Sequence, residues 1–323
     1  MMQISCGFPP GPHVVDHIVE AERLGYERAW LFDSPALYGD IWMIAAVAAT
    51  RTSRIGLGPA VLVPNLRHPL AQASAIATLE QLAPGRAAVA IGTGFTGRMA
   101  MGQKALTWAW TKRYIEQLRA LLRGEKVEVE GAVVQMLHGP DFAPAFPIPT
   151  PIVVAANGPK GLAVARELGD GVMTIGGGEE FDWCSVLAFG TVLDDGEPAG
   201  SDRALAAAGP GLTVVYHAMW EGDPSSVDAL PGGVEWRKSL EDVPENERHL
   251  AVHTDHMVRV TDRDRPLLDG DLLKAFTWTG TRAEVRARLD ALEAGGATEL
   301  LYVPMGPDVP RELQAFLDAA QHA

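Results

Sequence analysis

The sequence predicts an α/β fold, a (β/α)8 TIM barrel with insertion segments. Short apolar runs alternate with segments of helical periodicity over most of the 323 residues. The runs have no polar face, which is typical of parallel strands covered by helices on both sides of the sheet. We count about seven strand candidates before position 220 and one more at Glu299–Val303. Eight strands favour a closed barrel over an open sheet, so we expect residues 1–323 to form a single domain.

The strand candidates are short and rich in apolar residues, and the first of them ends at a run of prolines. The clearest are Gln3–Phe8, Arg28–Phe32, Arg54–Val63, Ala87–Gly92, Ile152–Ala156, Gly171–Ile175 and Glu299–Val303.

The helix candidates carry an apolar stripe at helical spacing, and several have recognisable ends. Gly25 ends the first helix, and Thr281 with Glu284 forms a capping box before a later one. We expect helices at Val14–Leu24, Tyr38–Thr50, Pro69–Ala83, Leu106–Leu122, Gly161–Leu168, Val285–Ala294 and Pro310–Ala320.

Two regions interrupt the alternation of strands and helices. Residues 125–136 alternate apolar and polar side chains around Gly131, which predicts an inserted hairpin. Residues 194–210 and 222–244 are rich in Gly, Pro, Ser and Asp and have no periodicity, so we expect loops there. They lie within an irregular insertion region, residues 180–275, expected near the barrel mouth.

The composition limits the classes of partner and the compartment. Lys and Arg number 27 and Asp and Glu 41, which gives a net charge of −14. A chain this acidic repels a nucleic-acid backbone, so we expect none as a partner. Two cysteines suit a reducing compartment, and no 18-residue apolar run or secretory signal is present. We therefore expect a cytoplasmic protein without a membrane partner.

Glycine-rich loops follow two successive strand candidates. Asn157-Gly158-Pro159 precedes a helix, and Gly176-Gly177-Gly178 comes one unit later. Glycine lets backbone amides approach an anion, and a helix N-terminus favours negative charge. The loops are thus candidates for one phosphate site, although the glycines could equally serve only to make tight turns. No G-x-G-x-x-G follows the first strand, which argues against a Rossmann dinucleotide site.

Other side chains suited to chemistry lie near expected strand ends or in the insertion region. Asp33 ends the second strand and is either a ligand contact or a helix cap or salt-bridge partner. His249, His253 and His256 form an H-x3-H-x2-H pattern. They are metal ligands, lining or proton-donating residues of an active site, or ordinary loop histidines. We assign no metal site, because the H-E-x-x-H pattern is absent.

Four segments of the chain resemble the luciferase-like flavin and deazaflavin oxidoreductases, in the order of that family. They are RIGLGPAVLVPNLRHP, LEQLAPGRAAVAIGTG, PIVVAANGPKGLAVARELGDGVMT and TGTRAEVRARLDALEAGGATELLYVP, which begin at residues 54, 79, 151 and 279. The resemblance implies a (β/α)8 barrel with a flavin-type ring in its mouth. That ring belongs either to coenzyme F420, a deazaflavin, or to FMN.

The resemblance also implies roles for individual residues. It places a non-prolyl cis peptide bond at Ala60-Val61, behind the ring, and Asp33 against the ring system. Asn157, Gly158, Gly176 and Gly177 correspond to the phosphate loops, and Gly94 and Thr174 also lie by the cofactor. Two positions depart from the sugar-phosphate dehydrogenases of the F420 group: Ser34 replaces a histidine and Phe95 an acidic residue. Oxidation of a sugar phosphate is therefore disfavoured.

The function expected is an F420-dependent oxidoreductase that moves a hydride between the deazaflavin and a small organic substrate. An FMN-dependent monooxygenase of the same family is the alternative, and a non-catalytic flavin-binding protein is the alternative from another class. Asp33 and His253 are the candidate catalytic residues, with His253 as the proton donor. Arg98 is a candidate for binding the acidic tail of the cofactor or the substrate. The resemblance is also compatible with a homodimer.

Overall fold

Eight parallel strands form one ring in the computed structural model, which describes residues 2–177 and 180–321. The hydrogen-bonded order is β3-β2-β1-β12-β9-β8-β7-β4. The strands are β1 Gln3–Phe8, β2 Arg28–Leu31, β3 Gly56–Pro59, β4 Val89–Ile91, β7 Ile152–Ala155, β8 Gly171–Thr174, β9 Cys184–Phe189 and β12 Glu299–Val303. The predicted barrel is confirmed. One strand of the ring, β9, is absent from the clearest sequence candidates.

The ring closes where β3 meets β4. Bridges join Leu57 to Ala87 and Leu62 to Ile91 in parallel register, and the Leu62 amide donates to the Ala90 carbonyl oxygen at 2.7 Å. Contact at this seam is unusually close. A Cβ atom on Gly58 would lie 1.7 Å from the carbonyl oxygen of Ala88, so only glycine fits there.

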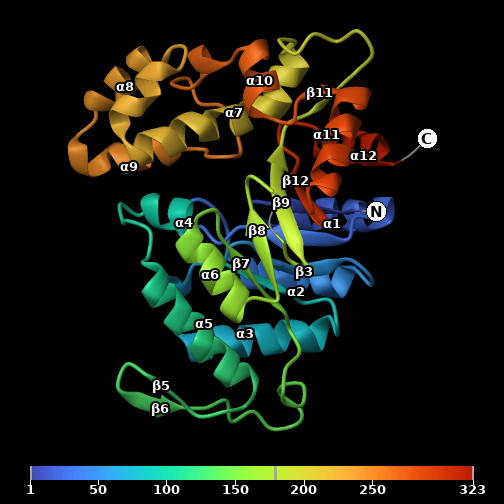
Figure 1. The fold of residues 1–323 in the computed structure, drawn as a ribbon, viewed down its shortest axis with the longest axis vertical. Helices are drawn as coiled ribbons and strands as arrows, with labels where there is room; N and C mark the ends of the chain where they lie inside the picture. The colour runs from blue at the N-terminus through green and yellow to red at the C-terminus, as the bar shows by residue number, and fades with distance from the viewer. Residues whose placement is uncertain (1, 178–179, 322–323) are drawn as a thin grey trace.

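Helices surround the ring, as Figure 1 shows. Asp40 sets the start of α2, because its carboxylate accepts from the amides of Trp42 and Met43; α2 therefore begins at Ile41 rather than Tyr38. The capping box of Thr281 with Glu284 is confirmed. The helices following the strands are α1 Val14–Leu24, α2 Ile41–Arg51, α3 Pro69–Leu82, α4 Phe95–Met99, α5 Trp108–Leu122, α6 Pro159–Leu168, α11 Arg282–Ala294 and α12 Val309–Ala320.

The inside of the ring is packed and carries one buried carboxylate. Glu299 accepts from the indole N–H of Trp30 at 3.1 Å and from that of Trp183. Above this polar group the packing is apolar. It includes Ala88, Ala90, Val153, Met173 and Leu301. Ligands of this barrel therefore have to bind at its rim rather than inside it.

The inserted hairpin is confirmed. Its strands, β5 Val127–Val129 and β6 Ala132–Val134, pair antiparallel.

The expectation of an irregular region at 180–275 is wrong. The region contains barrel strand β9 and, beyond it, a helical lobe that we define as residues 202–276. The lobe holds α7 Asp202–Gly222, α8 Gly233–Glu241, α9 Arg248–His253 and α10 Gly270–Phe276. It follows the carboxyl end of β9 and lies at one end of the barrel (Figure 1).

Tertiary packing explains why α7 is helical although its local sequence disfavours a helix. Gly209, Pro210 and Gly211 lie inside this helix and are buried. A Cβ atom on Gly211 would lie 2.5 Å from a ring carbon of Phe189, so the glycine permits close contact with the barrel. Burial of the helix outweighs the low helix propensity of Gly and Pro.

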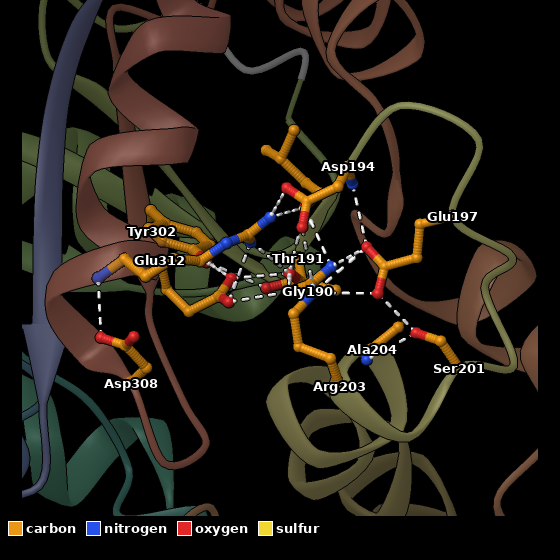
Figure 2. Close-up of polar contacts among 12 residues, drawn as sticks. Gly190, Thr191, Asp194, Glu197, Ser201, Arg203, Ala204, Tyr302, Asp308 and Glu312 are labelled. Atoms are coloured by element: carbon orange, nitrogen blue, oxygen red, sulfur yellow. Dashed lines mark hydrogen bonds and ion pairs between the residues drawn. The ribbon is translucent and has the colours of Figure 1, made fainter.

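A buried ion network joins the lobe to the barrel (Figure 2). Glu312 of α12 accepts from the Thr191 hydroxyl at 2.6 Å and from Arg203 of α7 at 3.1 Å. Arg203 also pairs with Glu197 at 2.5 Å. Burial raises the pKa of Glu312 although the two arginines, Arg203 and Arg311, oppose this rise.

The remaining short elements are β10 Val192–Leu193 and β11 Gly280–Thr281, which pair with each other, and the 3-10 turns at Pro64–Leu66, Pro224–Ala229, Glu245–Glu247 and Arg265–Leu267. Within residues 2–177 and 180–321, every helix is too short or too polar to cross a membrane.

Gly58→Ala should lower the free energy of unfolding by about 3 kcal/mol, because the added methyl group overlaps the backbone at the barrel seam. Urea titration followed by circular dichroism measures this change. Gly222→Ala is the control, since a Cβ atom at Gly222 meets nothing within 4 Å. Equal midpoints for Gly58→Ala and the wild type would contradict the close contact at the seam.

The stability of the protein should fall as the pH drops from about 4.5 toward about 2. Burial opposes ionisation of Glu197, but hydrogen bonds from Arg203 and Ser201 lower the pKa of its carboxyl from 4.5 to about 2. A carboxyl with a lowered folded-state pKa stabilises the fold above its unfolded pKa and loses this effect as it protonates. When the Tm from thermal melts is plotted against pH over this range, it should fall less steeply for Glu197→Gln than for the wild type. The exposed Glu245→Gln should keep the wild-type slope.

Candidate functional site

Asp33 lies at the carboxyl end of β2 and is engaged within the protein. The residue is 3% exposed, and its carboxylate pairs with Arg67 at 2.8 Å and accepts from the Val63 amide at 3.1 Å. Arg67 also pairs with Asp40 at 2.9 Å. Burial raises the pKa of Asp33, and the guanidinium of Arg67 opposes this rise. The carboxylate therefore fixes the loop after β3, which is a salt-bridge role that the sequence analysis left open.

The cis peptide bond that the resemblance implied, between Ala60 and Val61, directly follows β3. Small side chains surround this point. A Cβ atom on Gly92 would lie 3.2 Å from Val61 and 3.5 Å from the Cβ of Ala155, so the rims of β3, β4 and β7 meet there. We call the surface formed here by Val61, Gly92 and Ala155 the floor of the barrel rim.

The loop after β4 packs directly on the loops after β2 and β3. Gly94 has a φ of +77°, and a Cβ atom there would lie 2.6 Å from Val63. In the short helix α4, a Cβ atom on Gly97 would lie 2.9 Å from the carbonyl oxygen of Asp33 and 3.3 Å from the Ser34 hydroxyl. The structure thus brings together the predicted residues Asp33 and Gly94.

The loops after β7 and β8 form a second group of predicted residues. The Asn157 side-chain oxygen accepts from the Ile175 amide at 2.7 Å and from the Thr174 hydroxyl at 2.9 Å. The Thr174 hydroxyl in turn accepts from the Gly176 amide at 3.2 Å. Asn157 therefore clamps the two glycine loops to each other, as expected for residues serving one ligand.

The space beside this clamp is open. A Cβ atom on either Gly158 or Gly176 would meet nothing within 4 Å. Gly158 is the N-cap of α6, a helix of ten residues, so the amides of Lys160 and Gly161 lie in its first turn. First-turn amides have no acceptor within the helix and attract anions. The chemistry of this group suits a phosphate.

Two further residues of the predicted site are Arg98 and Gly177. Arg98 of α4 donates to the Lys104 carbonyl oxygen at 2.6 Å and is only partly exposed. Gly177 is the last described residue of its loop, and Gly178 lies outside the described residues.

His253 lies in the helical lobe, at the end of α9. It is 3% exposed, and its Nε2 atom lies 3.0 Å from an oxygen of Glu221. Its ring neighbours the rings of His217 and His256, with centroids 6.3 and 5.1 Å away. The structure therefore groups His253 with other histidines and not with Asp33 or Asn157.

The structure adds Arg67, Ile175 and His217 to the residues expected from the sequence, and it exposes the side chain of Phe95 in α4. Arg67 could have been found, since it follows the third strand in the segment PNLRHP, but its pairing with Asp33 carries no local pattern. Ile175 is 66% and Phe95 43% exposed, so both offer apolar surface at the rim. His217 belongs to α7, and nothing in its sequence spacing connects it to His253.

Comparison with known proteins identifies the class of protein. The sequence model of the luciferase-like monooxygenase family matches residues 5–184, and the chain belongs to this family. An F420-dependent glucose-6-phosphate dehydrogenase from Kineococcus radiotolerans is 35% identical, over 96% of this chain and 91% of that protein. A 5,10-methylenetetrahydromethanopterin reductase from Archaeoglobus fulgidus is 26% identical, over 91% and 90%.

The fold agrees with a solved relative. The coenzyme F420-dependent tetrahydromethanopterin reductase from Methanopyrus kandleri superposes with a TM-score of 0.66 at 20% identity, over 97% of this chain and 96% of that one. The family resemblance and the barrel predicted from the sequence are both confirmed.

Arg67→Met should lower the free energy of unfolding by about 3 kcal/mol at neutral pH, because it leaves the buried Asp33 carboxylate without its cation. The loss should shrink in acid, where Asp33 takes up a proton and becomes neutral. Urea titrations of the wild type and Arg67→Met at neutral and at acidic pH measure the loss of stability under each condition.

Asp33→Asn combined with Arg67→Met removes both charges and should restore part of the stability. A loss for Arg67→Met that is the same at both pH values would show that the carboxylate is not the source of the cost.

Proposed function

We propose that this protein is an F420-dependent oxidoreductase that transfers a hydride between the deazaflavin and a small organic substrate. The observation that carries the proposal is the pair of glycine loops after β7 and β8, which Asn157 clamps together beside open space at Gly158 and Gly176. Two relatives similar over nine-tenths of the chain, one F420-dependent by name, support the same function.

In this proposal the phosphate of the cofactor binds at the first turn of α6. The amides of Lys160 and Gly161 donate to it, and the absence of side chains at Gly158 and Gly176 lets it approach. The Asn157 clamp keeps both loops in register, so it acts as a positioning residue. Gly177 and Thr174 complete the binding loop.

The ring of the cofactor is proposed to lie on the floor at Ala60-Val61, where Gly92 and Ala155 leave room. Phe95 and Ile175 offer apolar surface at the rim. Asp33 holds the loop behind the ring through Val63 and Arg67. When bound, F420 supplies the hydride chemistry, and the protein supplies orientation and the exclusion of water. Arg98, beside Gly94, is proposed to bind the acidic tail.

His253 is not retained as the proton donor of this proposal. Its Nε2 atom is engaged with Glu221, and the ring packs among histidines of the lobe. Two other expectations are retained within it: a cytoplasmic location, which the two free buried cysteines favour, and a homodimer.

An FMN-dependent monooxygenase remains the second candidate, because the family includes monooxygenases by name and FMN also presents a phosphate. A flavin-binding protein without turnover is the third. Titration of the purified protein with F420 and with FMN, followed by absorbance and fluorescence, should show tight binding of F420. Substrate-dependent bleaching of F420 then separates an enzyme from a binder. Binding of FMN but not F420 would overturn the proposal.

Gly158→Asp should weaken binding of F420 at least about 10-fold, because a like charge meets the cofactor phosphate at the first turn of α6. Isothermal titration measures the affinity. The residue has an extended backbone and open space, so the fold should tolerate the change. Gly222→Asp, which also meets open space, is the matched control and should bind F420 as the wild type does. Unchanged affinity in Gly158→Asp would remove this loop from the site.

A further inference from the structure

Three buried histidines converge in the helical lobe, outside the cofactor site. His217 comes from α7, His253 from the end of α9, and His256 from the turn that follows. Their exposed fractions are 2%, 3% and 3%. Each offers one metal-binding atom, and these atoms all lie within 4.8 Å of one another. This spacing allows one ion to be shared by all three residues.

The hydrogen bonds within the cluster leave ring nitrogens unpartnered. The Nδ1 atoms of His217 and His256 lie 2.9 Å apart and can share one proton. The Nε2 atom of His256 and the Nδ1 atom of His253 are buried, and neither has a hydrogen-bond partner among the described residues. A buried polar atom without a partner costs about 1–3 kcal/mol, so two in one cluster call for an explanation.

Carboxylates lie next to a ring nitrogen of two of the histidines. Glu221 lies 3.0 Å from Nε2 of His253, and Asp264 lies 3.5 Å from Nε2 of His217. Asp264 is itself held in place, because it accepts from the Trp236 indole and the Thr261 hydroxyl, both at 2.7 Å. A carboxylate on one ring nitrogen orients the other toward a metal and makes it a better donor. In both histidines this places Nδ1 toward the centre of the cluster.

We propose that His217, His253 and His256 bind one divalent transition-metal ion of the zinc class. Three imidazole nitrogens suit zinc, cobalt, nickel or copper, whereas magnesium and calcium prefer oxygen ligands. The charges of Glu221 and Asp264 balance that of the ion. This site does not depend on the proposed F420 chemistry, and it assigns His253 as a metal ligand.

A cleft beside the cluster is the proposed source of a fourth ligand. His253 and His256 line a cleft of about 560 Å³ between the lobe and the barrel loops, whose wall also includes Pro10 and Tyr38. The Tyr38 hydroxyl donates to the His256 carbonyl oxygen at 2.6 Å and fixes that turn against the barrel. Water, or a small ligand with an oxygen or nitrogen donor, completes the coordination from this cleft.

The first experiment uses the full-length protein without an affinity tag, treated with EDTA and then dialysed. Cobalt(II) titration should produce intense visible ligand-field bands that saturate at one equivalent and are abolished by zinc. Zinc should also raise the Tm, because it binds the folded state. Failure of the wild type to bind either ion would overturn the proposal.

Matched variants locate the site. His256→Asn should abolish the cobalt bands, whereas His249→Asn, which alters a histidine of the same helix as His253, should keep them. Glu221→Gln should weaken zinc binding about 10- to 100-fold, as loss of an outer-shell carboxylate does. If His256→Asn does not fold, the zinc affinity of Glu221→Gln decides whether the ion binds at these histidines. Wild-type affinity in Glu221→Gln or His256→Asn, or equal loss in His249→Asn, would place the metal elsewhere and overturn the proposal.

Discussion

The strand ring closes at Gly58, and this closure sets the geometry of the barrel rim. The backbone of β3 approaches Ala88 so closely that no side chain fits between them. This contact brings the end of β3 against β4, and with it Val61 against Gly92 and Ala155. All strands of the ring are parallel, so their carboxyl ends share one rim. The floor of the proposed cofactor site is a direct consequence of that closure.

The ring fixes the strand ends, but side-chain hydrogen bonds fix the loops beyond them. Asn157 does this for the two glycine loops, because its amide oxygen replaces the backbone acceptor that a loop amide lacks. Asp33 does the same for the loop after β3, using a buried charge that Arg67 neutralises. Each loop group is thus held by one polar side chain from a neighbouring strand end. The arrangement leaves the glycine surfaces themselves free for a ligand.

The helical lobe is a separate layer with its own polar centre. Glu312 and Arg203 attach it to the barrel at one side, and Tyr38 contacts it at the other through the turn at His256. Between these attachments the lobe buries three histidines and the carboxylate of Asp264. A core of this size could have been built from apolar side chains alone. The convergence of imidazoles backed by carboxylates is the reason to read it as a binding site for an ion.

Local patterns in the sequence predict the barrel class, most strands, the capping box at Thr281 and the glycine loops, because each depends on local periodicity or on the conformational freedom of single residues. Tertiary packing accounts for the rest. It made α7 a helix through Gly209–Gly211, since burial against Phe189 outweighs local propensity. It also directed Asp33 to Arg67 and joined His217 to His253 and His256. Such pairings depend on distances in space between elements far apart in the chain, which no local spacing encodes.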